Sequence, residues 1–155
     1  MQAVIDTPLG KIRICEDGQG ISAVEFCDEA EEICGAGDNS GNPFLQDCAS
    51  QLYEYFAGKR KRFDVPLSPS GTDFQRAVWK ELRKIPYGET ATYGELAERI
   101  KNRKAARAVG MANHNNPISI IIPCHRCIGK DGSLTGYAGG LDKKAFLLEL
   151  EKNNL

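Results

Sequence analysis

The pattern of hydrophobic residues changes near residue 70, and this change constrains the fold more than any other feature of the sequence. Before it, polar and apolar residues alternate in segments 11–15 and 23–26, which is the period of a half-buried strand. After it, apolar residues recur at helical spacing behind typical capping residues. A linker rich in proline and glycine separates the two patterns. We therefore predict a mixed α/β protein with an N-terminal domain over residues 1–70 and a second domain over residues 71–155.

In the first domain, strands and turns precede a single helix. The acidic, glycine-rich stretch 28–41 is predicted to be a surface loop, after which Asn42 caps a helix that has Pro43 at its first position. Segment 62–66 is predicted to be a last strand. The helical face expected to lie on the sheet consists of Phe44, Cys48, Leu52, Tyr55 and Phe56.

The second domain is predicted to consist mainly of capped helices. Thr72 and Thr92 each begin a capping-box spacing, and a third helix is expected over about 103–113. The run 119–122 is expected to be buried and extended, and Asp142 is expected to cap a last helix. The residues expected to face inward on that helix are Ala145, Leu148 and Leu150.

The charge is divided unevenly between the two predicted domains. Residues 1–70 hold 6 Lys and Arg against 12 Asp and Glu, whereas residues 71–155 hold 14 against 9, so their net charges are −6 and +5. A basic domain favours a polyanionic partner, although ordinary surface variation is the alternative. No apolar run approaches the roughly 18–20 residues that span a bilayer, and the N-terminus lacks the basic start of a secretory signal. We expect a cytoplasmic protein, or a nuclear one in a eukaryote, with reduced cysteines.

Five basic residues and no acidic one lie from Arg99 to Arg107, where two short helices joined by a tight turn resemble a helix-turn-helix of winged-helix type. The B-DNA minor groove is only ~6 Å wide, and a helix with ordinary side chains measures ~10–12 Å across, so a helix trimmed to small residues can approach it more closely. The same face could pack against another helix, and a basic run is common on any solvated face. DNA binding is the favoured interpretation. The small residues are Ala105, Ala106, Ala108, Gly110 and Ala112.

Cys124 follows a buried apolar run and has His125 and Arg126 beside it. Positive charge and a nearby base favour a thiolate, so Cys124 is a candidate nucleophile, with a plain buried cysteine as the alternative. Together with Cys127 it has the C-x-x-C spacing of thiol redox proteins or of half a zinc site. Loop-forming residues follow, and a second cysteine pair is missing, so both of these alternatives are minor. We expect no metal and no cofactor.

Ile122-Pro123-Cys124-His125-Arg126 is preceded by Asn116-Pro117 and followed by Gly136-Tyr137-Ala138-Gly139-Gly140-Leu141. These motifs resemble the O6-alkylguanine-DNA alkyltransferases (methylated-DNA–protein-cysteine methyltransferases). The resemblance covers nearly all of residues 71–151, whereas the first seventy residues fit the family only in size and style. It implies direct-reversal DNA repair of O6-alkylguanine, and of O4-alkylthymine, in double-stranded DNA. The damaged base is flipped out of the duplex, and the alkyl group passes once and irreversibly to the protein. We expect a monomer.

The resemblance also implies the roles of individual catalytic residues. Cys124 matches the alkyl acceptor, His125 the residue that takes its proton through a water, and Glu151 the carboxylate that orients the imidazole. Tyr93 matches the phenol that supplies a proton to the departing guanine and meets the phosphate backbone. Asn116 matches the hinge between the recognition helix and the reactive segment.

Further residues are expected to contact the DNA or the flipped base. Arg107 matches the side chain that fills the stack vacated by that base. The other residues expected at the DNA are Arg103, Lys104 and Ala106, and those expected around the guanine pocket are Trp79, Tyr137, Ala138 and Gly139.

Two alternatives of other classes remain open at this point. One is a lesion-sensing DNA-binding module without transfer, which the trio Cys124, His125 and Glu151 disfavours. The other is a thiol oxidoreductase using Cys124 and Cys127, which the loop after Cys127 disfavours. The family usually has an aliphatic residue where this chain has Cys127, so we expect Cys127 to pack as a small apolar residue. Some members hold a structural zinc near the N-terminus, but the first domain here has no histidine.

Overall fold

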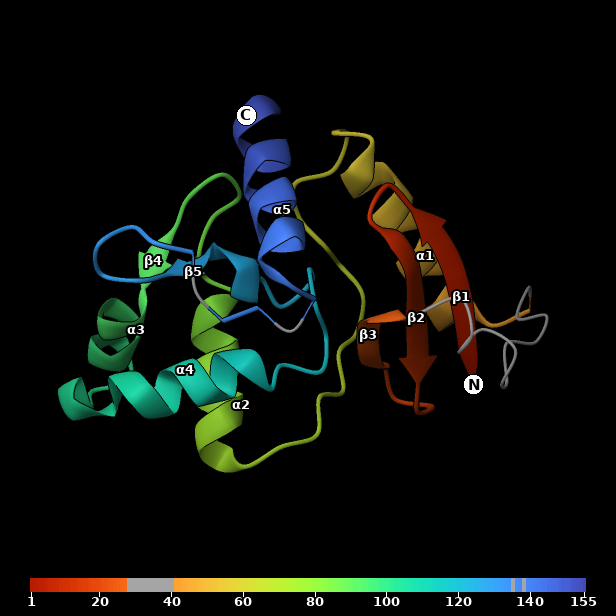
Figure 1. The fold of residues 1–155 in the computed structure, drawn as a ribbon. Helices are drawn as coiled ribbons and strands as arrows, with labels where there is room; N and C mark the ends of the chain where they lie inside the picture. Colours follow the sequence, from red (N-terminus) through yellow and green to blue (C-terminus); the bar gives the residue numbers. More distant parts are fainter. Residues whose placement is uncertain (28–40, 135, 138) are drawn as a thin grey trace. The chain divides into compact units, whose positions relative to one another are not determined.

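The computed structural model describes residues 1–27, 41–134, 136–137 and 139–155, which form two compact units (Figure 1). The first unit, Met1–Ser70, is a small sheet with one described helix, and the second, Gly71–Leu155, is mainly helical. The predicted fold class is confirmed. None of the described helices is long and apolar enough to cross a membrane.

The sheet of the first unit has three antiparallel strands in the order β1-β2-β3: β1 (Gln2–Thr7), β2 (Gly10–Glu16) and β3 (Ile21–Cys27). The tight β1–β2 turn needs a positive φ at its last residue, and Gly10 supplies it with φ of 100°. On β2, Ile12 and Ile14 are fully buried, while Lys11, Arg13 and Cys15 on the alternate positions are partly exposed. The predicted alternation is therefore confirmed for β2.

Helix α1 (Pro43–Phe56) packs on this sheet. The Asn42 side chain accepts a hydrogen bond from the backbone N–H of Leu45 at 3.1 Å, so the predicted cap is confirmed. The buried residues of α1 are Leu45, Cys48, Gln51, Leu52 and Tyr55, whereas Phe44 and Phe56 are only half-buried. The surface loop predicted at 28–41 lies, except for its last residue, outside the described residues.

The strand predicted at 62–66 is wrong. The backbone N–H of Asp64 donates to the Gln51 side chain at 2.9 Å, and Pro66 has no N–H to offer a neighbouring strand. The segment instead makes a single parallel bridge one residue later, between Leu67 and Ile21.

The second unit begins with helices α2 (Asp73–Leu82), α3 (Tyr93–Arg99) and α4 (Ala106–His114), and α4 packs against α2 and α3. Thr72 and Gln75 form a reciprocal capping box at α2, and Thr92 caps α3, as predicted. The predicted third helix starts as a 3₁₀ turn, η2 (Arg103–Ala105), before α4. The α3–η2–α4 arrangement is the expected helix-turn-helix.

The run 119–122 is buried, as predicted, but it is a turn rather than an extended segment. The Asn116 side chain braces it: Oδ1 accepts from the backbone N–H of Ile118 at 2.9 Å, and Nδ2 donates to the carbonyl of Ile122 at 2.8 Å. Within the turn, Ile120 has a φ of 73°, which is strained for a β-branched residue. The turn leads into η3 (Cys124–Arg126) and β5 (Cys127–Ile128), which pairs in parallel with β4 (Ala91–Thr92).

The last helix, α5 (Leu141–Asn153), differs from the prediction in its cap and in its buried face. Gly140, with φ of 102°, is the N-cap residue, and Asp142 lies inside the first turn. The buried residues are Lys144, Leu147 and Glu151, whereas Ala145 is exposed. Two of the three buried side chains are charged, so hydrophobic periodicity could not identify this face.

Candidate active site

Cys124 opens the 3₁₀ turn η3 and is only 4% exposed. Burial raises the pKa of its thiol to about 11, while a hydrogen bond from Asn116 and the charge of Lys144 act in the opposite direction. The resting side chain at neutral pH is therefore a thiol. A reaction through sulfur requires a group that removes its proton.

His125 and Glu151 form a fully buried pair, with His125 Nε2 and Glu151 Oε2 2.6 Å apart. Burial lowers the pKa of His125 and outweighs the opposing effect of Glu151, so the imidazole is neutral. Because Nε2 faces the carboxylate, Nε2 carries the hydrogen and Nδ1 is the basic atom. Among the described residues, Nδ1 has no hydrogen-bond partner. The pair thus presents an oriented, unoccupied base next to Cys124 in the chain.

Glu151 is held as a carboxylate by more than His125. Arg126 donates to it from Nε at 2.8 Å and from Nη2 at 3.0 Å, and the backbone N–H of Gly88 donates at 3.1 Å. Burial alone would raise the pKa of Glu151, but His125 and Arg126 together hold it well below its usual range. The third guanidinium contact runs from Arg126 Nη1 to the carbonyl of Ile85 at 2.7 Å. Arg126 therefore fixes the carboxylate that orients the imidazole.

Lys144 is a second buried cation at this site, with 0% exposure. Its Nζ donates to the carbonyl of Cys127 at 2.6 Å, and its charge lowers the pKa of Cys124. Burial in turn lowers the pKa of Lys144 itself. The roles of Lys144 and of Arg126 as a carboxylate anchor were not predicted from the sequence. The available signal was the spacing of three and four residues from Lys144 through Leu147 to Glu151, which places all three on one helical face.

Asn116 and Glu151 reach the segment of Cys124 and His125 from other parts of the chain. Asn116 braces the turn before Cys124 and also bonds to its sulfur. Tyr137 is 7% exposed; burial raises its pKa, and the charge of a Cys124 thiolate would raise it further. Tyr93 lies next to Gly136, because a Cβ on that glycine would be 3.8 Å from the tyrosine hydroxyl.

The other predicted pocket residues have different positions. Trp79 lies in the core, where its indole N–H donates to the carbonyl of Ala112 at 2.8 Å, and it does not line the groove beside α4 described below. Gly139 is half-buried in the segment before α5. Ala138 lies outside the described residues.

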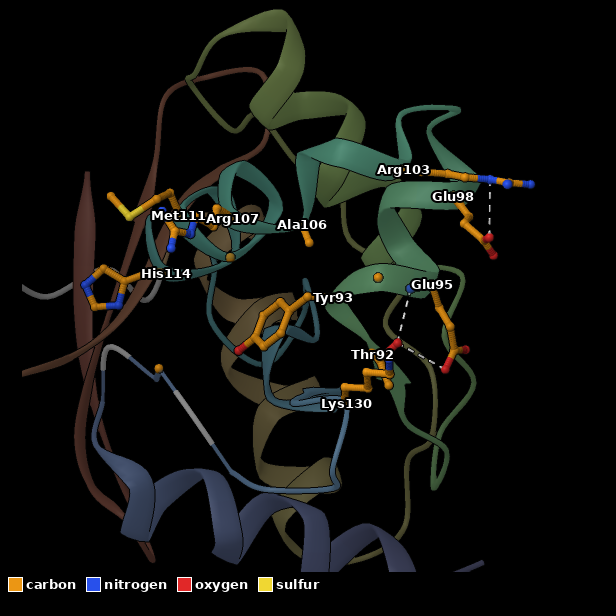
Figure 2. A pocket seen from close by; sticks show the side chains of 13 residues that line it. Thr92, Tyr93, Glu95, Glu98, Arg103, Ala106, Arg107, Met111, His114 and Lys130 are labelled. Atoms are coloured by element: carbon orange, nitrogen blue, oxygen red, sulfur yellow. Dashed lines mark hydrogen bonds and ion pairs between the residues drawn. The ribbon is translucent and has the colours of Figure 1, made fainter.

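An open groove of about 1030 Å³ runs between α3, α4 and the residues Lys130 and Gly136 (Figure 2). Ala106 and Gly110 form a strip of small residues along it, and Tyr93 and Arg107 also line it. The sequence left two explanations for the small residues, packing against another helix and room for a partner. Ala105 and Ala112 are buried and fit the first, whereas Ala106 and Gly110 line the groove and fit the second.

The predicted DNA-contacting cations are exposed around this groove. Arg107 has no ion pair among the described residues, and Arg103 Nε lies 3.5 Å from Glu98 Oε1 at the groove wall. Lys104 is exposed but does not line the groove. An exposed pair such as Arg103–Glu98 contributes little stability, so Arg103 can exchange its partner for a phosphate.

The C-x-x-C alternatives can be tested against the geometry. Cys124 and Cys127 are both free thiols, and burial raises the pKa of Cys127 to about 12. A redox pair needs a low-pKa thiol, and neither cysteine has one. Within the described part of the chain, no three His, Cys, Asp or Glu side chains lie close enough to hold a metal ion.

Two family models match the chain, one to each unit. Residues 1–69 match the "6-O-methylguanine DNA methyltransferase, ribonuclease-like domain", and residues 73–153 match the "6-O-methylguanine DNA methyltransferase, DNA binding domain". Together the two matches cover nearly the whole chain. They include residues 1–69, where the sequence offered no family motif.

Related proteins and solved structures agree with these models. The methylated-DNA–protein-cysteine methyltransferase of Methanosarcina acetivorans is 51% identical over 151 residues, 96% of each chain. That of Mycobacterium tuberculosis is 46% identical over 149 residues, 96% of this chain and 90% of the relative. The structure of Mycobacterium tuberculosis OGT in complex with DNA superposes with a TM-score of 0.89 at 45% identity, covering 99% of this chain and 93% of that one.

Proposed function

The chain belongs to the 6-O-methylguanine DNA methyltransferase family and is a DNA-repair methyltransferase, and we propose that Cys124 is its alkyl acceptor. The observation that carries the proposal is the buried Cys124 thiol followed in the chain by His125, whose free Nδ1 is oriented through Glu151. This arrangement suits nucleophilic attack better than lesion sensing without transfer. The high pKa values of both thiols also make an oxidoreductase the poorer interpretation.

The proposed reaction moves one alkyl group and conserves protons. The thiol proton passes through a water to His125 Nδ1, and the Cys124 sulfur attacks the alkyl carbon in line with the departing O6. The C–O bond breaks with its electron pair going to the guanine, and the ring gains a proton from Tyr93. Tyr93 recovers a proton from solvent, and His125 releases to solvent the proton that it received. Lys144 and Asn116 stabilise the thiolate while it forms.

The product is a thioether, which makes the transfer a single event for each molecule. Reversal would expel Cys124 as a buried thiolate, and a thiol of pKa about 11 is a poor leaving group at neutral pH. The proposed substrate is O6-alkylguanine in double-stranded DNA, with O4-alkylthymine as a second substrate. The monomeric state and the cytoplasmic location stay predictions.

The DNA is proposed to occupy the groove beside α4. Ala106 and Gly110 let the helix approach the narrow minor groove, and Arg107 fills the position that the flipped base leaves. Tyr93 and Gly136 both line this groove, and Gly136 directly precedes Tyr137 in the chain. A base turned out beside Arg107 would therefore meet Tyr93 on the groove wall.

Intact-mass analysis after incubation with an O6-methylguanine duplex tests the proposal. The wild-type chain is expected to gain one methyl group and then stop, and Cys124→Ser to gain none. Cys127→Val is the matched control, since it removes the neighbouring buried thiol and is expected to react like the wild type. Methylation mapped to Cys127, or repeated turnover, would contradict the mechanism.

A further inference from the structure

Met111 is an exposed apolar side chain on the helix that faces the DNA. It is 62% exposed, the largest value for a large apolar side chain among the described residues apart from those at the two chain ends. It lines the groove together with Arg107 (Figure 2). A single exposed methionine is ordinary on a protein surface, but this one stands on the surface where the proposed function places the minor groove.

The spacing on α4 sets Met111 beside Arg107 rather than on another face. The two residues are four apart, as are Ala106 and Gly110, so the helix presents a low strip of small residues next to a ridge of two long side chains. Val109, Ala112 and Asn113 occupy the buried side. A duplex that follows the low strip therefore meets both residues of the ridge.

We propose that Met111 is a second wedge residue, which packs against sugar and base edges next to the position that Arg107 fills and so stabilises the flipped-out state of the damaged nucleotide. The inference rests on the proposed function. Four helical residues correspond to ~6 Å along the axis, and successive base pairs are ~3.4 Å apart, so Met111 lies within about two base steps of the position that Arg107 fills. Minor-groove proteins use apolar wedges of this kind, methionine included. An unbranched thioether also adapts to an irregular, partly unstacked surface.

The test uses Met111→Ala and Met111→Leu, with Phe146→Ala as the control. Phe146 is 37% exposed on α5 and does not line the groove. In single-turnover transfer from saturating O6-methylguanine duplex, Met111→Ala is expected to react about tenfold more slowly than wild type, equivalent to about 1.4 kcal/mol. Met111→Leu is expected to stay within about twofold, because it retains an apolar side chain of similar volume. Phe146→Ala is expected to match the wild type.

Two further substrates separate the wedge from general binding. Free O6-benzylguanine needs no flipping, so all variants are expected to react with it at the wild-type rate. With the lesion in a single strand, where little unstacking is needed, the defect of Met111→Ala is expected to shrink to below about twofold. A wild-type rate for Met111→Ala on the duplex, or an equal loss on duplex and single strand, would overturn the wedge role. The proposed function is judged separately, by whether the wild type transfers the methyl group to Cys124.

Discussion

Replacing Arg126 with leucine is expected to destabilise the second unit by about 3–5 kcal/mol, the usual cost of removing one partner of a buried ion pair. Arg126 is 6% exposed, and its guanidinium makes two hydrogen bonds to Glu151 and one to the carbonyl of Ile85, at distances from 2.7 to 3.0 Å. Without it, a carboxylate with 0% exposure loses two charge-assisted hydrogen bonds. Arg126→Lys is the matched control: it retains the charge but not the planar fork, so its loss is expected to be smaller.

Guanidinium chloride unfolding of the wild type and both variants measures the loss, with an unchanged m-value showing that the same structure unfolds. A second readout follows from electrostatics. Arg126 lowers the pKa of His125, so its removal is expected to raise that pKa and move the acid limb of the rate profile with free O6-benzylguanine to higher pH. A stability loss below about 1 kcal/mol for Arg126→Leu, combined with an unmoved pH profile, would refute the anchoring role.

Three further predictions follow from the site and the groove. Glu151 has a lowered pKa in the folded state, so its stabilising effect is complete above about pH 4.3 and is lost as the pH falls through the folded pKa. In urea unfolding at several pH values, Glu151→Gln is therefore expected to weaken the fall of the free energy of unfolding at acid pH. Arg107→Ala is expected to slow transfer from duplex DNA far more than transfer from free O6-benzylguanine, and equal losses on both substrates would count against its wedge role. Lys104→Ala is instead expected to flatten the slope of log affinity against log salt by about one. Cys127→Val is expected to leave the reduced protein's transfer rate nearly unchanged and to give little protection from mild oxidant; strong protection, with a Cys124–Cys127 disulfide in the wild type, would show a redox role instead.

Elements with a local signal could be predicted from the sequence. Asn42, Thr72 and Thr92 each cap the helix that was predicted to begin directly after them. Such caps can be predicted because a cap depends only on residues within one turn. The helix-turn-helix followed from the capped helix α3 and the basic helix predicted directly after it. Cys124 could be proposed as the reactive residue because the motif around it is contiguous in the chain.

Elements decided by distant contacts could not be predicted. The run 119–122 has the composition of a buried strand, but the Asn116 side chain folds it into a turn, and an apolar run does not distinguish the two. The inward face of α5 was missed because Lys144 and Glu151 are buried only where partners from other segments receive them. Buried charge is visible in a structure and not in a hydrophobic pattern.

The chemistry of Cys124 depends on where the proton of its thiol goes. Burial raises the pKa of the thiol to about 11, although Asn116 and the charge of Lys144 lower it, so ionising it at pH 7 costs about 5 kcal/mol with these contributions already included. Transfer of the proton to His125 keeps the net charge of the buried site constant, because the thiolate and the imidazolium form together, and Glu151 beside the imidazole stabilises that imidazolium. Alkylation leaves the sulfur as a neutral thioether with no proton to lose, so the nucleophile cannot form again.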